Sequence, residues 1–306
     1  MMKRKNNFIL LTCAVLLIAY SCSSKKTDVS DTPNEGTIYI SVEQSFRPVI
    51  EQQIKMYENS YPGTHIIATY KPEAECLRDF FNDSITRMAI VSRALTPDED
   101  RAMKRKLGYL PGCQQVASDA VVLILHPNRK DSLFTLDGLR NELSGKANGN
   151  VFVFDGQRAT GTVRYIRDSI LKGAMYNTAN VGAKNSASEV INFVANNEDA
   201  IGFVGISEIG NPEDSSQFNL RKQIKFGYVR CDVCQDSPYV MPLQQSLNTR
   251  RYPLTRGMYY AIKENYTGLG SGFSSFLKYE RGQLIFRRSY LSPIMNLNDR
   301  NVEINQ

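Results

Sequence analysis

The sequence predicts an α/β fold with mainly parallel β-sheets. Runs rich in β-branched and aromatic residues alternate along the chain with segments whose apolar residues recur at the helical period of 3.6. The chain has 306 residues, enough for about two domains, and it is 42% hydrophobic and 22% charged. This composition is that of a globular protein, and it excludes a disordered, collagen-like or polytopic membrane protein.

The predicted strands are apolar runs bounded by turn residues. The first is rich in β-branched residues, and the run at residues 117–125 is the most apolar of all and is ended by Pro127. In order, we expect strands over residues 37–42, 65–70, 88–91, 117–125, 151–154, 200–204, 223–229 and 258–262.

The predicted helices lie between these strands. In the first, apolar residues from Phe46 to Tyr57 recur close to the helical spacing, and Pro62 and Gly63 end the segment. In order, we expect helices over residues 46–57, 77–82, 98–107, 136–143, 163–171, 187–196 and 273–279, the last continued by residues 283–287. Helices alternating with strands in this way favour parallel sheets.

The N-terminus is typical of an export signal. Residues 3–5 are basic, and residues 8–20 form an apolar run that is too short to cross about 30 Å of hydrocarbon. Small residues at positions 19 and 21 then precede Cys22. This pattern resembles the bacterial lipobox, in which the cysteine is acylated, although Tyr20 is larger than the residue usually found there.

The expected product is a membrane-anchored lipoprotein outside the cytoplasm, in the periplasm. We expect residues 1–21 to be removed as a lipoprotein signal peptide and Cys22 to carry the lipid. Residues 22–35 are polar and lack apolar periodicity, so we expect them to form a flexible tether. The alternative is an ordinary secretory signal cleaved after Ser21, with Cys22 incidental.

Charge and histidine content exclude several classes of function. The net charge is +6, of which residues 3–5 supply three charges, and no basic cluster lies beside aromatic residues. Nucleic acid is therefore not an expected partner. The only histidines are His65 and His126, so we expect no metal, no cofactor and no histidine-based catalysis.

The cysteines give a limited signal. Cys231 and Cys234 form a lone CxxC without a second pair at zinc-finger spacing, so zinc and redox chemistry are disfavoured. A local disulfide and two unpaired thiols both remain open for this pair. Cys76 and Cys113 are expected to be small core residues.

A series of short segments resembles one protein family in both order and spacing. They are Ser45-Phe46 at a predicted helix start, Ile90-Val91-Ser92-Arg93-Ala94-Leu95 with Glu99 after it, Ala117-Ser118-Asp119-Ala120-Val121-Val122 with His126-Pro127-Asn128, Leu139 with Leu143-Ser144-Gly145, Ala159-Thr160-Gly161-Thr162, Asn185-Ser186, Ala200-Ile201-Gly202-Phe203-Val204, Tyr252-Pro253-Leu254-Thr255-Arg256 and Gly282-Gln283-Leu284-Ile285. Together they resemble the PstS-type phosphate-binding proteins of bacterial ABC importers over most of residues 36–294.

This resemblance implies a two-lobed periplasmic-binding fold of type II, with the ligand in a cleft between two α/β lobes. We place lobe one at residues 36–127 and 229–306, and lobe two at residues 128–228. The implied function is the capture of inorganic phosphate for ABC permease subunits in the membrane, by a monomer that is not an enzyme. The enzyme alternative lacks support, because the chain has no GxSxG and no base beside Ser92 in the sequence.

The oxyanion site itself is predicted from donors at helix starts. A tetrahedral oxyanion held without metal needs many N–H and O–H donors, and helix N-termini supply exposed N–H groups and partial positive charge. The expected phosphate ligands are Ser45, Phe46 through its backbone N–H, Ser92, Arg93, Thr160, Gly161 and Thr162. The alternative for Ser45, Thr160 and Thr162 is a plain helix N-cap.

The chain also departs from the family pattern. The arginine that precedes the Gly-Ser-Gly-Thr motif of the family is Gly156 here, with Arg158 displaced by two positions as a candidate ligand. Arg93 stands where the best-known members have an aspartate that accepts the proton of phosphate. Glu73 or Glu75 is then the candidate acceptor, and we expect phosphate to be preferred over sulfate by at least about 2 kcal/mol.

These departures keep a second function open. A lipoprotein of the same fold would then bind another oxyanion, or would serve in protein interaction or sensing.

Overall fold

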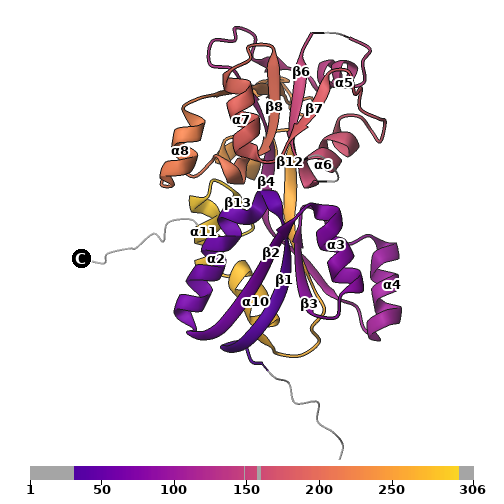
Figure 1. Ribbon diagram of the computed structural model, residues 1–306, viewed down its shortest axis with the longest axis vertical. Coiled ribbons are helices and arrows are strands. Elements are labelled where there is room, and N and C mark those ends of the chain that lie inside the picture. Colours follow the sequence, from indigo (N-terminus) through magenta and orange to yellow (C-terminus); the bar gives the residue numbers. More distant parts are fainter. Residues whose placement is uncertain (1–30, 148, 157–159, 296–306) are drawn as a thin grey trace, which may run out of the picture.

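The computed structural model describes residues 31–147, 149–156 and 160–295, and these form two lobes joined at a waist (Figure 1). Its strands are β1 (Glu35–Glu43), β2 (Gly63–Lys71), β3 (Thr86–Val91), β4 (Gly112–Leu125), β5 (Leu133–Phe134), β6 (Val151–Asp155), β7 (Val181–Lys184), β8 (Ala200–Gly205), β9 (Lys225–Phe226), β10 (Tyr228–Arg230), β11 (Tyr239–Val240), β12 (Thr255–Ile262) and β13 (Ser292–Pro293). Its helices are α2 (Arg47–Ser60), α3 (Glu73–Asn82), α4 (Pro97–Leu107), α5 (Leu136–Leu143), α6 (Gly161–Ser169), α7 (Ala187–Ala195), α8 (Ser215–Arg221), α9 (Gln244–Asn248), α10 (Leu269–Lys278) and α11 (Glu280–Arg288), with 3-10 turns η1 (Gln44–Phe46) and η2 (Ile206–Glu208).

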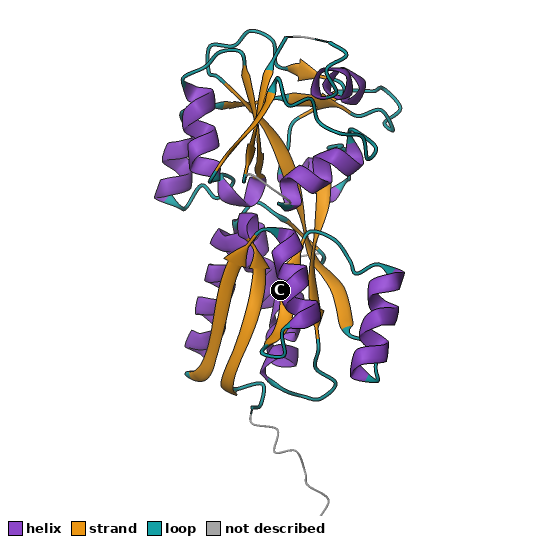
Figure 2. Cartoon of the chain, turned by 45° about the vertical axis from the view of Figure 1, so that its right-hand side comes forward, coloured by secondary structure: helices purple, strands orange, loops and turns teal. Residues whose placement is uncertain are grey.

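The main sheet runs through both lobes in the order β2-β1-β3-β12-β4-β8-β6-β7. Strands pair in parallel within each lobe, as β1 does with β2 and β3, and β6 with β7 and β8. At the waist the pairing is antiparallel, because β12 pairs with β3 and β4, and β4 pairs with β8. The predicted α/β class is confirmed, and β4 and β12 are the strands that pass between the lobes (Figures 1 and 2).

Each lobe has its own hydrophobic core, and β4 contributes to both. Val116 and Ala117 pack in the core of the lower lobe in Figure 1, with β1, β3 and α2. Residues 120–125 of the same strand pack in the core of the upper lobe, with β6, β8 and α7. One strand shared by two cores fixes where the lobes meet. The exact lobe boundaries stay a prediction; Val229 and Leu254 pack with the upper core.

The folded body begins earlier than the sequence suggested. Asp31, placed in the tether by the sequence, is buried, and its carboxylate pairs with Arg87 at 2.8 Å. Leu269 donates its backbone N–H to the same carboxylate at 2.6 Å. Residues 31–35 are therefore part of the lower lobe rather than of a flexible linker.

Two elements differ from their predicted extents for local reasons. The strand expected over residues 223–229 is broken into β9 and β10 at Gly227, where the backbone runs so close that a Cβ would lie 3.0 Å from Leu123 Cβ. Helix α3 begins at Glu73, four residues before the expected start, because Pro72 precedes it and acidic residues occupy its first turn. The short β7, α8 and α9 were not predicted.

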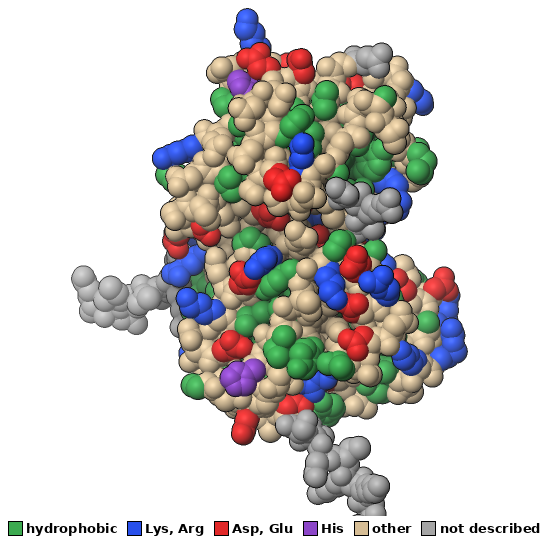
Figure 3. Space-filling model, in the orientation of Figure 1, with side chains coloured by type: hydrophobic (Ala, Val, Ile, Leu, Met, Phe, Trp, Pro, Cys, Tyr) green, Lys and Arg blue, Asp and Glu red, His purple; other side chains and the backbone are tan. Residues whose placement is uncertain are grey.

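The surface and the cysteines complete the description. No helix within the described ranges is long and apolar enough to cross a membrane. Basic and acidic side chains are interspersed over the face drawn in Figure 3. Cys231 and Cys234 form a disulfide, which decides between the two alternatives left open above, while Cys76 and Cys113 are free. The signal peptide and Cys22 lie outside the described residues.

Candidate functional site

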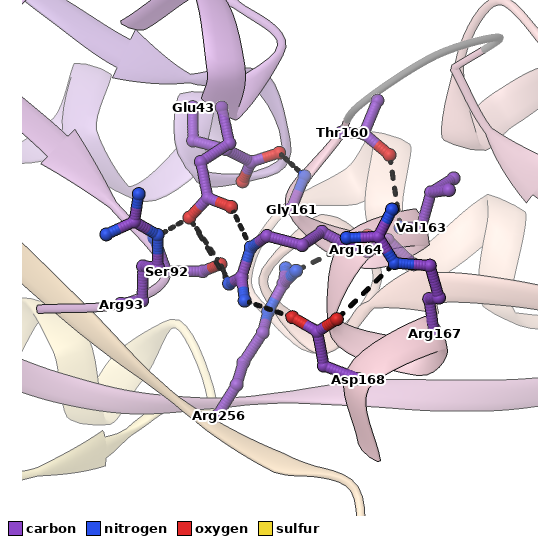
Figure 4. Close-up of polar contacts among 12 residues, drawn as sticks. Glu43, Ser92, Arg93, Thr160, Gly161, Val163, Arg164, Arg167, Asp168 and Arg256 are labelled. Carbon is purple, nitrogen blue, oxygen red and sulfur yellow. Dashed lines mark hydrogen bonds and ion pairs between the residues drawn. The ribbon is translucent and has the colours of Figure 1, made fainter. Parts of the chain in front are cut away.

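Four chain segments meet at the waist, where strands of both lobes end. The lower lobe supplies Glu43 at the end of β1, Ser45 in the following turn η1, and Ser92 just after β3. The upper lobe supplies the N-terminus of α6 at Gly161, and β12 supplies Arg256 from between the lobes. Figure 4 shows Glu43, Ser92 and Arg256 gathered around the start of α6 at Gly161. The three donor segments expected from the sequence therefore lie together.

The first group of contacts centres on Glu43, whose side chain is buried. Ser45 donates its hydroxyl to this carboxylate, and the backbone N–H of Gly161 donates to it at 3.4 Å across the waist. A Cβ on Gly161 would lie 3.0 Å from Ser92 Oγ and 3.2 Å from both Arg256 Nη1 and Glu43 Cδ. Glycine at this position is thus what allows the helix terminus to approach the lower lobe.

Arg256 links the same group to the sheet. Its guanidinium donates to Asp119 Oδ2 and to Ser45 Oγ, each at 2.8 Å, and to Thr162 Oγ1 at 3.4 Å. The guanidinium also lies over the ring of Phe46, 5.1 Å from its centroid. The residue is only 3% exposed, so Arg256 is a buried cation surrounded by hydrogen-bond partners.

The second group of contacts centres on Glu73. Its Oε1 accepts the backbone N–H and the hydroxyl of Ser92, both at 2.8 Å. Its Oε2 accepts from Arg164 Nε, and Arg164 Nη2 also donates to Ser92 Oγ at 2.9 Å. Burial opposes ionisation of Glu73, but Arg164 and the Ser92 donors outweigh it and hold the pKa of this carboxyl below its usual range.

Asp155 is the last residue of β6 and contacts Thr162 at the start of α6. One of its carboxylate oxygens has no hydrogen-bond partner among the described residues. Thr162 donates to Oδ2 at 3.5 Å, whereas Oδ1 is buried and accepts no hydrogen bond from any residue that the structure describes. Burial raises the pKa of Asp155 to about 8, and the neighbouring Glu43 adds to this rise while Arg256 opposes it. The pKa of Glu43 is raised by burial as well. Burial therefore favours the neutral, protonated form of Asp155.

The hydroxyl of Thr160 makes hydrogen bonds within its own segment of the chain. Its hydroxyl donates to the carbonyl oxygen of Asp155 at 3.1 Å and accepts the N–H of Val163 at 3.2 Å, which makes it the N-cap of α6. Thr162, by contrast, points its hydroxyl toward Asp155 and Arg256. Of the two threonines, Thr162 is the one whose side chain belongs to the charged group.

Several residues expected at the site are engaged elsewhere. Arg93 makes a two-pronged ion pair with Glu99, with both nitrogen–oxygen distances 2.7 Å, and it lies on the far side of Ser92 from Arg164 (Figure 4). Glu75 faces Arg78 at 3.6 Å. Arg158 lies outside the described residues.

Sequence reasoning missed the charged residues that complete the group, namely Glu43, Asp119, Asp155, Arg164 and Arg256. Two of them carry a local signal, because Glu43 and Asp155 are acidic residues at the last position of a strand whose end faces the waist. Arg164 is the fourth residue of α6, and nothing in its neighbourhood along the chain indicates a contact with Ser92. Within the described ranges no group of three or more histidines, cysteines or acidic residues is placed to hold a metal ion.

The arrangement is suited to hold an oxyanion. Backbone N–H groups, hydroxyls and two guanidinium groups converge from both lobes on carboxylate oxygens, which are themselves anionic acceptors. We find no hydroxyl paired with a histidine base among the described residues of the site.

Known structures share this fold. A Clostridium perfringens protein described as a phosphate ABC transporter substrate-binding protein, with phosphate bound, superposes with a TM-score of 0.69 at 19% identity, covering 85% of this chain and all of its own. An ABC-type phosphate transport receptor from Vibrio cholerae gives a TM-score of 0.65 at 16% identity, covering 83% of this chain and 99% of its own. PstS from Borrelia burgdorferi gives 0.56 at 19% identity, covering 86% of this chain and all of its own.

At these identities the likeness establishes the fold, the two-lobed periplasmic-binding architecture expected above. These neighbours are named as binding proteins and not as enzymes. No curated protein matches the sequence. The family model described as the PBP superfamily domain matches residues 27–280, most of the chain, and the protein therefore belongs to that family.

Proposed function

We propose that this protein is a lipid-anchored extracytoplasmic solute-binding protein that captures a tetrahedral oxyanion, inorganic phosphate in the first place, for an ABC importer. One observation carries the proposal: the Gly161 N–H, the Ser92 N–H and hydroxyl, and Arg164 all donate to carboxylate oxygens at the waist. Donors that already meet anionic oxygens are suited to an oxyanion. The neighbours in Clostridium perfringens and Vibrio cholerae are named for phosphate.

The proposed ligand contacts come from both lobes. They are Ser45, the Phe46 backbone N–H, Ser92, Gly161, Thr162, Arg164 and Arg256. Arg164 takes the place that we expected for Arg93, because its guanidinium reaches Ser92 whereas that of Arg93 is held by Glu99. Because the contacts span two lobes, binding would favour the closed arrangement of the lobes.

Calorimetric titration tests the proposal. We expect the purified protein to bind phosphate, and Arg164→Ala to weaken binding about ten- to a hundredfold, since a hydrogen bond to a charged group is worth roughly 1.5–3 kcal/mol. Arg93→Ala is the matched control, because it removes the guanidinium that pairs with Glu99. Absence of heat with phosphate, arsenate, sulfate and molybdate would reject the oxyanion function.

The second candidate is a protein of the same fold that senses or binds another protein. It is favoured by the fact that carboxylates of the chain itself, those of Glu43 and Glu73, accept from the donors proposed for the anion. The titration separates the two candidates. The lipid anchor at Cys22, the monomeric state and the permease partner belong to the first proposal and are expected to hold with it.

A further inference from the structure

We propose that Glu73 is an internal competitor of the bound anion. Its carboxylate fills one half of the anion site, bridges the two lobes, and must leave before an oxyanion binds there. This inference rests on the proposed function for its ligand. In this view Glu73 controls two properties of the site: its affinity for an anion, and the distance between the lobes at which the anion binds.

The first argument is that Glu73 uses the donors an oxyanion needs. Oε1 takes both hydrogen bonds that Ser92 can give, from its backbone N–H and its hydroxyl, each at 2.8 Å. Oε2 takes Arg164 Nε. Two oxygens of one carboxylate, held by an N–H, an O–H and a guanidinium, match the way one edge of a phosphate or sulfate group is held.

The second argument is that this contact joins the lobes. Glu73 is the first residue of α3, in the lower lobe, and Arg164 belongs to α6, in the upper lobe (Figure 1). The Glu73 side chain is 1% exposed, whereas the Arg164 side chain is 23% exposed, so the carboxylate lies inside the interface and the guanidinium reaches it from nearer the rim. A buried ion pair of this kind is strongly destabilised when one partner is removed. The pair is therefore a direct contact that helps to hold the two lobes together.

The third argument is that the carboxylate and an oxyanion exclude each other. The Ser92 N–H carries one hydrogen, and Oε1 of Glu73 already accepts it. An oxyanion beside an ionised Glu73 would face like charge in a site removed from water. Arg164 does not depend on Glu73 alone, because it also pairs with Asp168 at 3.1 Å. When Glu73 leaves, the guanidinium keeps a carboxylate partner and remains available to the anion.

The experiment is a phosphate titration of the purified protein and of Glu73→Gln. The amide keeps the shape of the side chain, and its carbonyl oxygen can still accept from Ser92, so this substitution removes the charge with the least change in packing. Losing the charge should tighten phosphate binding by about ten- to a hundredfold, whereas loss of a ligand contact would weaken it. Glu75→Gln is the matched control, because it makes the same change on the same helix at a residue that faces Arg78, and it should leave the affinity unchanged.

Small-angle X-ray scattering supplies a readout that needs no ligand. Without phosphate, the wild type should stay compact, and Glu73→Ala and Arg164→Ala should both show a larger radius of gyration because the bridge between the lobes is lost. A melting curve for each variant confirms that it is folded.

Each outcome decides the inference. Weaker or equal phosphate affinity in Glu73→Gln overturns the competitor role. Binding that is seen in Glu73→Gln but not in the wild type supports it. If neither the wild type nor any variant binds an oxyanion, the proposed function is wrong. The scattering experiment still tests the Glu73–Arg164 contact in that case, because an unchanged radius of gyration in both alanine variants would show that this contact does not hold the lobes together.

Discussion

Arg256 and Asp119 are direct cross-strand partners of β12 and β4, and the hydrogen bond from Arg256 Nε to Asp119 Oδ2 measures 2.8 Å. Both side chains are almost completely buried. These two strands are the ones that pass between the lobes. The pair therefore fixes the Arg256 guanidinium at the point where residues of both lobes meet, and it joins the two central strands to the candidate site.

Arg256→Met should lower the free energy of unfolding by about 3–5 kcal/mol, because the Asp119 carboxylate would remain buried without its charged partner. Urea unfolding measures this difference. Arg256→Met combined with Asp119→Leu should recover part of the loss, since the Asp119 carboxylate is then no longer left buried without its partner. A loss below about 1 kcal/mol for the single variant would show that water or another group compensates the carboxylate.

The two threonines of the motif should respond differently to substitution. Thr160→Ala removes the N-cap of α6 and should lower stability by about 1 kcal/mol. Thr162→Val keeps the shape of the side chain but removes the hydroxyl near Arg256 and Asp155, so it should weaken phosphate binding about tenfold at least. Calorimetry and thermal unfolding of both variants separate the roles. A larger loss of affinity in Thr160→Ala than in Thr162→Val would reverse the assignment.

Cys22→Ser should abolish lipid attachment, because the acyl chain needs the thiol of that cysteine. The expected result is a loss of palmitate labelling, with protein that is either released from the membrane or left uncleaved. Cys13→Ser is the control, since Cys13 lies inside the expected signal peptide and its substitution should leave the labelling unchanged. Labelling that persists in Cys22→Ser would contradict the lipoprotein assignment.

The fold was largely predictable because its signals are local. The apolar runs that became β4, β6 and β8 and the periodic segments that became α2, α4 and α5 lie where the sequence placed them, with shifts of a few residues at their ends. The errors have local causes that only the packed chain shows. Gly227 breaks a strand because Leu123 lies against it, and Asp31 joins the fold because Arg87, distant in sequence, pairs with it.

The site was predictable in part, for a related reason. Helix starts and strand ends can be seen in the sequence, and the structure brings Ser45, Ser92 and Gly161 together. The choice of arginine could not be predicted from neighbours along the chain. Arg93 adjoins Ser92 in sequence but pairs with Glu99, whereas Arg164, 72 residues away, donates to Ser92.

The choice of acceptor for the phosphate proton changes for the same reason. Glu73 and Glu75 were the expected acceptors. The carboxylate of Glu73 already accepts hydrogen bonds from Ser92 and Arg164, and Glu75 faces Arg78. Asp155 Oδ1 is a buried carboxylate oxygen that has no hydrogen-bond partner within the described ranges. It is therefore the better candidate to distinguish anions that carry a proton from anions that do not.

Selectivity for phosphate over sulfate should therefore increase with pH. Burial, together with the neighbouring Glu43, raises the pKa of Asp155 to about 8, and Arg256 opposes this rise. Below that pH the carboxyl keeps its proton and can donate to either anion. Above it the carboxylate can only accept, which HPO₄²⁻ satisfies with its own proton and SO₄²⁻ cannot. Sulfate affinity should then fall by about tenfold for each pH unit above the pKa of Asp155, since one proton must be taken up on binding.

Competition titrations between pH 6 and pH 9 measure this ratio. In Asp155→Asn the amide can donate at any pH, so the ratio of phosphate to sulfate affinity should be smaller and nearly independent of pH. Glu75→Gln provides the control, because its side chain faces Arg78 and the pH dependence of the wild type should persist. A ratio that does not change with pH in the wild type would mean that Asp155 does not contact the anion, and the acceptor would have to be sought at Glu43, the other carboxyl of the site with a raised pKa that meets Gly161.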